Sequence, residues 1–322
     1  MTESNASSLE DWDCPLGCPR GDDFVLEGRD RLHELPGRFQ VVRCRSCGLL
    51  RTNPRPTASA MSSYYPDDYG PYAGTRIREE HPDTRSGWRR WLSDIVAGIT
   101  DRDTQRLPPL PPGRLLEIGS ASGSYLQQMS KAGWDVEGIE FSENAAAQAR
   151  AAGYRVRSGT VEAAAEPKEP FDLVVAWMVL EHLHDPVLAL RRIREWTSPG
   201  AWLVASVPNA GCWELRAFSD AWYALHLPNH LWHPTVPTLS RVLERAGWKL
   251  ERVVFHRDLR DLVGSLGYVM EDRGWLPRLA ARLKAFPEAG GRLSQALFPL
   301  AALLATAGQT GRMTIWARRR ND

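Results

Sequence analysis

A loop of small residues and two acidic residues supply the groups that a nucleoside-binding site needs. Residues 115–124 read L-L-E-I-G-S-A-S-G-S, an apolar run that ends in the loop. Gly119 lets the backbone turn tightly under a ligand, and Gly123 begins a helix whose free N–H groups point back at the loop. Further along, the run 134–140 ends in Glu140, whose carboxylate can accept hydrogen bonds from both ribose hydroxyls. Glu117 and Glu140 therefore predict a nucleoside pocket between two neighbouring strands.

The loop resembles the first motif of the class I S-adenosylmethionine (SAM) methyltransferases, E/D-x-G-x-G-x-G. This chain reads E-I-G-S-A-S-G over residues 117–123, so Ala121 replaces the middle glycine. We expect alanine to be tolerated there if it keeps a negative φ. A dinucleotide-binding loop would read G-x-G-x-x-G, and that spacing does not fit. The alternative is an ordinary turn of small residues between a strand and a helix.

A second segment strengthens the resemblance. Residues 171–186 read F-D-L-V-V-A-W-M-V-L-E-H-L-H-D-P, similar to the fourth methyltransferase motif, F-D-x-V…L-E-H-x…D-P. The resemblance implies that Trp177 and Met178 lie near the cofactor, and that Glu181 and His182 lie at the mouth of its pocket. The alternative is that Glu181 and His182 cap the following helix and hold the loop.

The resemblance implies SAM as the cofactor. In such proteins the turn after the third strand, expected here near 154–158, holds the adenine, which makes Val161 and Glu162 candidates. The full set of expected cofactor-binding residues is Glu117, Gly119, Ser120, Ala121, Gly123, Tyr125, Glu140, Phe141, Val161, Glu162, Trp177 and Met178.

A histidine-containing loop follows the fifth expected strand, residues 201–207. Residues 227–234 read L-P-N-H-L-W-H-P and resemble the segment L-P-R-H-L-x-H-F of a bacterial subfamily. Ligands bind beyond the carboxyl ends of an open parallel sheet, so this loop should form a wall of the substrate cavity. A histidine can take a proton from a hydroxyl at neutral pH. We expect His230 to be the first choice of catalytic base, with His182, His233 and Glu181 as further catalytic candidates.

Other interpretations of these histidines remain open. They could serve merely to hydrogen-bond the loop. A metal site made of His226, His230 and His233 is disfavoured, because no carboxylate or cysteine has matching spacing in the sequence.

Four of the five cysteines form two close pairs near the N-terminus. The pattern is Cys14-x3-Cys18 followed by Cys44-x2-Cys47-Gly48, and each pair can form a tight turn that directs two thiolates at one point. Four thiolates satisfy a structural Zn²⁺ and leave no open position for catalysis. Two expected strands between the pairs predict a zinc ribbon; the alternative is free or redox-active cysteines.

The segment after the ribbon, with N-P-R-P at 53–56 and Y-Y at 64–65, extends the likeness. It resembles a bacterial subfamily in which a zinc ribbon precedes the methyltransferase domain. Members often act on sugars, lipids or secondary metabolites.

From residue 114 onward, strands alternate with helices, which predicts a parallel sheet with crossover helices. We expect an α/β, Rossmann-like, seven-stranded methyltransferase sheet, a small N-terminal zinc ribbon and a helical insertion before the last strand. The expected parts are a ribbon at 1–60, a helical linker or cap at 61–113 with a helix near 88–100, and a methyltransferase domain at 114–322. The insertion spans 257–310.

Composition and charge limit the range of partners. The formal net charge is +1, so no global field attracts nucleic acid. No lysine occurs before Lys131, and the arginines of the ribbon region are interleaved with acidic residues. We expect a small-molecule acceptor and no nucleic acid; the oligomeric state is left open.

The sequence also bears on location. Residues 1–6 are polar, which predicts no signal peptide, and no run reaches the length of a membrane span. We expect a cytoplasmic protein. The cationic and apolar stretch 275–307 suggests contact with a membrane surface or a lipid-linked substrate; the alternatives are a lid, a packed helix pair or a dimer interface.

The sequence therefore predicts a SAM-dependent methyltransferase acting on a sugar, lipid-linked or secondary-metabolite acceptor, most readily by O- or C-transfer. Two alternatives remain, an RNA methyltransferase and a non-catalytic SAM-binding protein.

Overall fold

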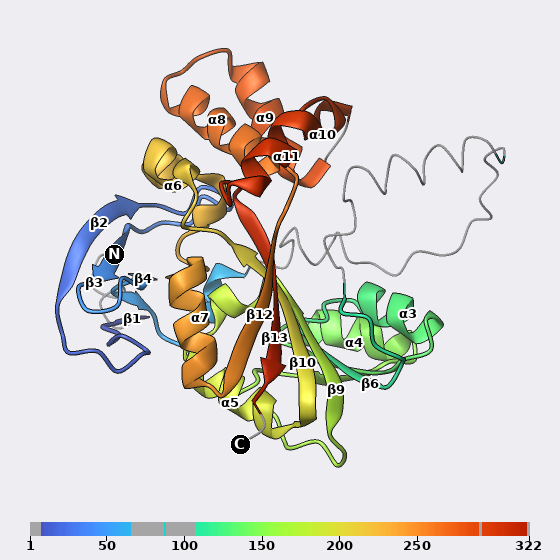
Figure 1. The fold of residues 1–322 in the computed structure, drawn as a ribbon. Coiled ribbons are helices and arrows are strands. Elements are labelled where there is room, and N and C mark those ends of the chain that lie inside the picture. The colour runs from blue at the N-terminus through green and yellow to red at the C-terminus, as the bar shows by residue number, and fades with distance from the viewer. Residues whose placement is uncertain (1–7, 66–86, 88–106, 290–291, 321–322) are drawn as a thin grey trace.

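A twisted β-sheet flanked by helices forms the main domain of the protein (Figure 1). The computed structural model describes residues 8–65, 87, 107–289 and 292–320. Within these ranges, seven strands are ordered β12-β13-β10-β9-β6-β7-β8. The five strands from β10 to β8 are parallel, and β13 is antiparallel to both neighbours. The strands are β6 (Arg114–Ile118), β7 (Asp135–Glu140), β8 (Arg155–Ser158), β9 (Phe171–Trp177), β10 (Thr197–Pro208), β12 (Trp248–Phe255) and β13 (Arg312–Arg319).

The expected Rossmann-like class is confirmed by this topology. The last strand, β13, inserts between β10 and β12 rather than adding to an edge. From β6 the chain adds β7 and β8 on one side of the sheet and then β9 and β10 on the other, so the strand order switches at β6. In open α/β sheets, ligands bind at such a switch point, outside the carboxyl ends of the strands.

Helices cover both faces of the sheet (Figure 1). Side chains alternate along β6, so Leu115 packs in the core with α3 and α4, whereas Leu116 packs in the core with α5 and α7. Both are fully buried, as expected for a strand covered on each side. The helices are α3 (Ser124–Lys131), α4 (Glu143–Ala151), α5 (Pro186–Glu195) and α7 (Val236–Arg245).

The N-terminal part forms a second, smaller sheet that includes a strand from far along the chain. Its order among the described residues is β11-β4-β3-β2. The two strands expected between the cysteine pairs are present as β2 (Asp22–Gly28) and β3 (Phe39–Cys44). Next to β4 (Leu50–Thr52) lies β11 (Trp232–His233), which belongs to the loop after β10. The ribbon region is therefore joined by backbone hydrogen bonds to the loop that carries the histidines.

The helical insertion follows β12 and precedes β13 in the sequence, and its helices gather at one end of the sheet (Figure 1). It consists of α8 (Arg260–Asp272), α9 (Pro277–Ala289), α10 (Arg292–Ala296) and α11 (Phe298–Thr306). Pro299 lies in the first turn of α11, where a proline costs no hydrogen bond.

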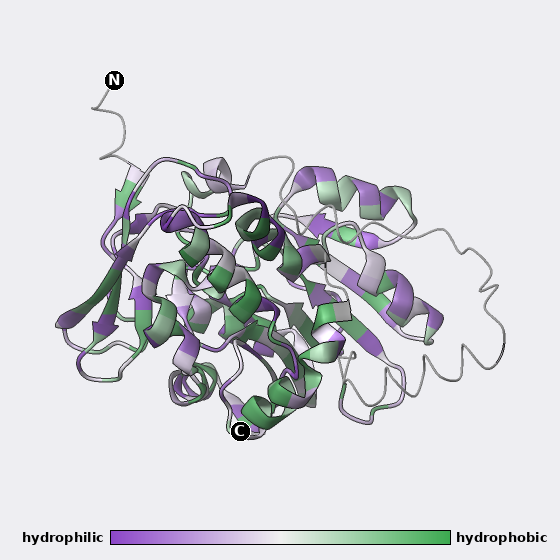
Figure 2. Ribbon diagram, turned by 90° about the horizontal axis from the view of Figure 1, so that it is seen from above, coloured by the Kyte–Doolittle hydropathy of each residue, from purple (hydrophilic) through white to green (hydrophobic). Residues whose placement is uncertain are grey.

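Apolar residues gather toward the middle of the molecule when it is seen from above (Figure 2). No helix in the described ranges has the length and apolar character needed to cross a bilayer. The helix expected near 88–100 and most of the cap expected at 61–113 lie outside the described residues.

Candidate functional site

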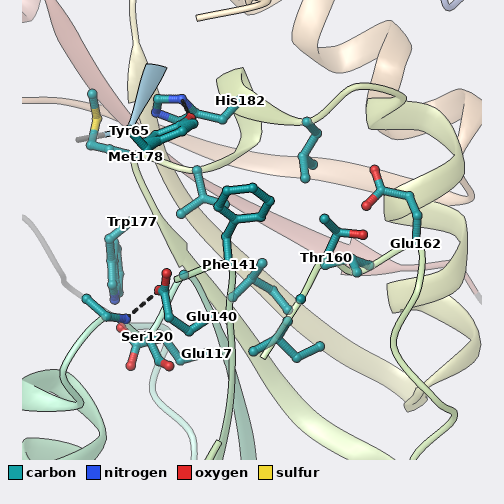
Figure 3. A pocket seen from close by; sticks show the side chains of 18 of the residues that line it. Tyr65, Glu117, Ser120, Glu140, Phe141, Thr160, Glu162, Trp177, Met178 and His182 are labelled. Atoms are coloured by element: carbon teal, nitrogen blue, oxygen red, sulfur yellow. Dashed lines mark hydrogen bonds between the residues drawn. The ribbon is translucent and has the colours of Figure 1, made fainter. Parts of the chain in front are cut away.

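A cavity lies at the carboxyl ends of β6, β7 and β9, where the switch in strand order predicts one (Figure 3). Every residue expected to bind the cofactor lines this cavity except Gly123, which stays behind the loop as the N-cap of α3 with φ +89°. The assignment of these residues to a cofactor remains a prediction. The lining residues from the expected set are Glu117, Gly119, Ser120, Ala121, Tyr125, Glu140, Phe141, Val161, Glu162, Trp177 and Met178.

Glu140 is held by the backbone around the loop. Its Oε2 accepts a hydrogen bond from the Ala121 N–H at 2.8 Å, and its Oε1 accepts one from the Ser142 N–H at 2.8 Å. Burial raises the pKa of Glu140, and these N–H donors oppose that rise. Each oxygen keeps a lone pair for a ligand, because a carboxylate oxygen accepts more than one hydrogen bond.

Several buried polar atoms of the cavity have no hydrogen-bond partner among the described residues. They are Oε2 of Glu117, Oγ of Ser120 and Nε1 of Trp177. Burial, and then the nearby Glu140, raise the pKa of Glu117 well above its ordinary value. Two adjacent buried carboxyl groups favour a cationic ligand, and SAM carries both a sulfonium and an ammonium group. The residues present therefore fit SAM.

The loop backbone corrects one expectation. Ala121 has φ +45°, so the condition under which alanine was expected to be tolerated, a negative φ, is not met. The physical reason is the tightness of the turn. Gly119, at φ +73°, already reverses the chain, and a left-handed Ala121 then lets its own N–H point at Glu140. A Cβ added at Gly119 would lie 2.5 Å from Cγ2 of Val179. Alanine at 121 accepts a left-handed conformation that glycine adopts at lower cost.

Sequence reasoning missed part of the cavity lining. The ring of Tyr65 lies 5.7 Å from that of Phe141, centroid to centroid, and also faces the cavity. In the sequence, the Tyr64-Tyr65 pair after the ribbon stands out only as part of a resemblance. The further lining residues outside the expected set are Ala58, Met61, Ile118, Ser124, Ile139, Gly159, Thr160, Val179, Leu183 and His184.

A second, larger cavity adjoins the first. Their volumes are about 880 Å³ and 280 Å³, and both are lined by Trp177, Met178 and His182. Met178 has φ +57° at the end of β9, and such strain in a non-glycine residue is often found at functional sites. His226 and His230 of the histidine loop line the larger cavity; that this cavity holds the substrate stays a prediction.

The two histidines of the junction have defined tautomers. Nδ1 of His230 lies 3.0 Å from the Ala224 carbonyl oxygen, and Nδ1 of His182 lies 3.0 Å from the Asn229 carbonyl oxygen. A carbonyl oxygen only accepts, so Nδ1 carries the proton in each ring and the lone pair lies on Nε2. Burial lowers the pKa of His182 to about 4 and that of His230 well below its usual range. Both rings are therefore neutral.

Glu181 and His233 line neither of these two cavities. Glu181 lies in the single turn η3 (Leu180–His182), fully buried behind the histidines. Nε2 of His233 lies 3.3 Å from Oγ1 of Thr52, whose hydroxyl donates to the His230 carbonyl oxygen at 2.7 Å. In this arrangement His233 and Thr52 hold the loop in place.

The four paired cysteines meet at one point. Sγ atoms of Cys14, Cys18, Cys44 and Cys47 lie within 4.8 Å of one another, and those of Cys14 and Cys47 are 3.5 Å apart. Each pair turns tightly, with the Gly17 N–H bonded to the Cys14 carbonyl and the Gly48 N–H to the Cys44 carbonyl. A tetrahedral zinc with Zn–S bonds near 2.3 Å needs sulfur atoms roughly 3.8 Å apart. The cluster fits that ion.

Comparison with known proteins gives the same class as the fold. A family model described as a methyltransferase domain matches residues 89–253. The ubiquinone biosynthesis O-methyltransferase of Sinorhizobium medicae is 34% identical over 189 residues, which cover 57% of this chain and 71% of that protein. The protein of the same name from Azorhizobium caulinodans is 33% identical over 125 residues, 37% of this chain and 49% of that protein.

The match spans about half the length of the relatives from Azorhizobium caulinodans and Ruegeria pomeroyi. Among solved structures, a SAM-dependent methyltransferase from Mesorhizobium loti is similar at 19% identity and a TM-score of 0.44, covering 70% of this chain and 96% of that one.

The sheet order and the cavity at its switch point define a class I methyltransferase fold. The chain belongs to the methyltransferase domain family, whose class I members depend on SAM.

Proposed function

We propose that this protein transfers a methyl group from SAM to a hydroxyl oxygen of a small-molecule acceptor. The observation that carries the proposal is the junction of the two cavities at Trp177, Met178 and His182. A cofactor in the smaller cavity and an acceptor in the larger one would meet there. The relatives named as O-methyltransferases support oxygen as the atom that receives the methyl group.

The binding step uses this chain's own residues. Glu140 would accept hydrogen bonds from the ribose hydroxyls, and Glu117 would face a cationic part of the cofactor. Phe141 and Val161 would pack against the faces of the adenine ring, near Thr160 and Glu162. SAM supplies the electrophilic methyl group when it is bound.

The transfer step needs the acceptor oxygen, the methyl carbon and sulfur in line, so positioning supplies much of the rate. The oxygen–carbon bond forms, the carbon–sulfur bond breaks with its electron pair on sulfur, and the hydroxyl proton leaves the acceptor. The groups that assist the loss of this proton lie among Glu181, His182 and His230, the predicted catalytic residues beside the junction.

The acceptor cavity carries both aromatic and charged groups. The rings of Tyr223 and Tyr268 stack with centroids 5.7 Å apart, and the Arg31 guanidinium lies over Tyr268. Arg31 is itself paired with Asp220 and Asp272. A polar, ring-bearing acceptor fits such walls, so we keep sugars, lipid-linked compounds and secondary metabolites as the candidate classes.

The four-cysteine cluster is proposed as a structural zinc site. Burial raises the pKa of the Cys18 thiol to about 11, so a cation is needed to hold four thiolates together. All four positions would be taken by protein, which gives zinc a folding role rather than a catalytic one.

Titration calorimetry with SAM tests the cofactor assignment. Glu140→Gln should weaken binding by about 10- to 100-fold, because hydrogen bonds to a charged group are worth roughly 1.5–3 kcal/mol. Glu143→Gln is the matched control, since Glu143 is an exposed residue of α4 that does not line the cavity. Equal binding by the two variants, or no binding by the natural chain, would contradict the proposal.

A further inference from the structure

Glu181 is a buried carboxylate without a hydrogen-bond partner. Its side chain has no exposed surface, and neither Oε1 nor Oε2 has a partner among the described residues. A buried carboxyl group is normally paired or hydrogen-bonded, because leaving it unmatched costs free energy. The helix-capping role considered from the sequence would need an acceptor contact that these oxygens do not make.

Two neutral histidines face the same point. A carboxylate oxygen of Glu181 and one ring nitrogen each of His182 and His230 all lie within 4.8 Å of one another. Within this group, Nε2 of His230 and Oε1 of Glu181 are 3.9 Å apart. That separation is too long for a hydrogen bond, yet it approaches the distance between two ligand atoms on one metal ion. A small inward movement of the two side chains would bring these atoms to that distance.

The surroundings of the histidines match those of metal ligands. A histidine that binds a metal commonly donates its other ring N–H to a backbone carbonyl, which fixes the tautomer and turns the ring. Nδ1–H of His230 donates to the Ala224 carbonyl oxygen, and Nδ1–H of His182 donates to the Asn229 carbonyl oxygen. The hydroxyl oxygen of Tyr65 also lies 2.8 Å from Nδ1 of His182. A metal ligand needs a free lone pair, and with Nδ1–H donated to a carbonyl oxygen the lone pair of each ring lies on Nε2.

We propose that Glu181, His182 and His230 bind one divalent transition-metal ion at the junction of the two cavities. Two nitrogen donors and one oxygen donor suit ions such as Mn²⁺, Fe²⁺, Co²⁺ or Zn²⁺. Three protein ligands leave positions open toward the larger cavity, which His182 and His230 line. Sequence spacing does not disclose this site, because its carboxylate comes from η3 and its second histidine from the loop after β10.

The chemical role of the ion rests on the proposed function. An acceptor hydroxyl bound at an open position becomes more acidic, as metal-bound water does. Its proton would pass to water in the larger cavity, and the oxygen would take the methyl group as the carbon–sulfur electron pair returns to sulfur. In this mechanism His230 holds the ion instead of acting as the base expected from the sequence.

Binding of Mn²⁺ to the full chain, with zinc supplied to the four cysteines, tests the site without SAM or acceptor. Mn²⁺ prefers oxygen and nitrogen to thiolate ligands, so it distinguishes this cluster from the cysteine site. Electron paramagnetic resonance of free Mn²⁺ should reveal one bound ion per chain. Glu181→Gln and His230→Ala should each weaken binding by about 10- to 100-fold or more, the range that even outer-shell changes can reach.

The control is Glu214→Gln, which alters another buried carboxyl group outside the cluster and should leave Mn²⁺ binding unchanged. Retained SAM affinity in Glu181→Gln and His230→Ala would establish that both variants are folded. No bound Mn²⁺ in the natural chain, or equal binding by Glu181→Gln, would overturn the proposal. Failure of SAM binding would instead refute the proposed function, so the two results are distinguishable.

Discussion

At the scale of single residues, the cofactor loop accepts backbone strain in order to present one N–H group. Ala121 takes φ +45° and donates to Glu140. The side chain is small enough to remain buried there, at 7% exposure. The loop thus keeps its hydrogen bond although the usual glycine of the motif is missing.

Replacing Ala121 by glycine should relieve this strain. We expect the free energy of unfolding to stay the same or rise by up to about 1 kcal/mol, because glycine adopts positive φ without the clash of a Cβ. Ala147→Gly, at an exposed position within α4, should lower it by about 1 kcal/mol. Urea unfolding of the two variants measures the difference. A loss in Ala121→Gly equal to that in Ala147→Gly would show that the loop is not strained.

Glu214 is a second residue whose environment has a measurable consequence. It belongs to α6 (Trp213–Phe218), is 1% exposed, and accepts a hydrogen bond from Nε1 of Trp222. Burial, and next the charge of Asp261, raise the pKa of Glu214 to about 8; Arg312 opposes the rise, and Asp258 adds to it. The folded protein therefore keeps this carboxyl group protonated at neutral pH.

The pH dependence of stability follows from that raised pKa. The stabilising contribution of neutral Glu214 is complete below its ordinary pKa of 4.5 and is lost as pH rises toward 8, because the unfolded chain releases the proton first. Glu214→Gln should thus be more stable than the natural chain at pH 8 but not at pH 4.5. The gain is at most about 1.4 kcal/mol for each tenfold difference in proton affinity between the folded and unfolded chains. Thermal unfolding across this range measures the difference, with Glu244→Gln at an exposed position of α7 as the control. Parallel curves for all three proteins would contradict the assignment.

At the scale of elements, the ribbon region and the histidine loop form one sheet. Strand β11 pairs with β4, the Thr52 N–H donates to the Leu231 carbonyl at 2.9 Å, and the Thr52 hydroxyl donates to the His230 carbonyl. The ribbon therefore positions a wall of the larger cavity, whereas the smaller cavity is built largely on β6, β7 and β9. Loss of the ribbon should affect the two cavities unequally.

Cys47→Ser should reduce zinc content and lower methyl transfer at least about tenfold, with SAM affinity nearly unchanged. The reason is that His230 loses the support of β4, while Glu117 and Glu140 remain in the central sheet. Metal analysis, turnover and calorimetry with SAM measure the three effects. Cys212→Ala is the control, because this buried thiol lies outside the four-cysteine cluster. Full turnover in zinc-free Cys47→Ser would show that the ribbon does not position the loop.

At the scale of the whole molecule, exposed apolar side chains concentrate on the helical insertion. Trp275 is 54% exposed, Leu276 66% and Leu279 42%, and the exposed Arg278 and Arg282 lie beside them in the sequence. Part of α8 and α9 also lines the larger cavity, through Tyr268 and Pro287. Apolar and cationic groups together are typical of a surface that lies on an anionic bilayer.

Flotation with anionic lipid vesicles tests this prediction of a membrane contact. The double variant Leu276→Glu, Leu279→Glu should bind at least about fivefold more weakly, because it removes apolar anchors and adds like charge to the lipid. Leu188→Glu, at an exposed leucine of α5, should bind as the natural chain does. Absence of binding to anionic vesicles, or equal loss in Leu188→Glu, would favour a lid or a dimer interface for the insertion.

Local sequence determined the elements and half of the site. The alternation of strands and helices expected from residue 114 onward is present, because apolar periodicity and caps such as Ser142 and Asp185 act over a few neighbours. A cavity at this edge of the sheet was predictable for the same reason: Glu117, Gly119 and Glu140 lie at or just after strand ends, and parallel strands bring their carboxyl ends together. That these residues bind a cofactor stays a prediction.

Tertiary structure alone decided the rest. The positive φ of Ala121, the pairing of β11 with β4 and the meeting of Glu181 with His230 all depend on contacts between segments far apart in the chain. Spacing along a sequence carries no information on such contacts, since they arise only when packing forces distant loops onto one sheet edge. The sequence thus predicted a nucleoside-type cofactor, and the fold decided which buried groups meet beside the cavity at the strand ends.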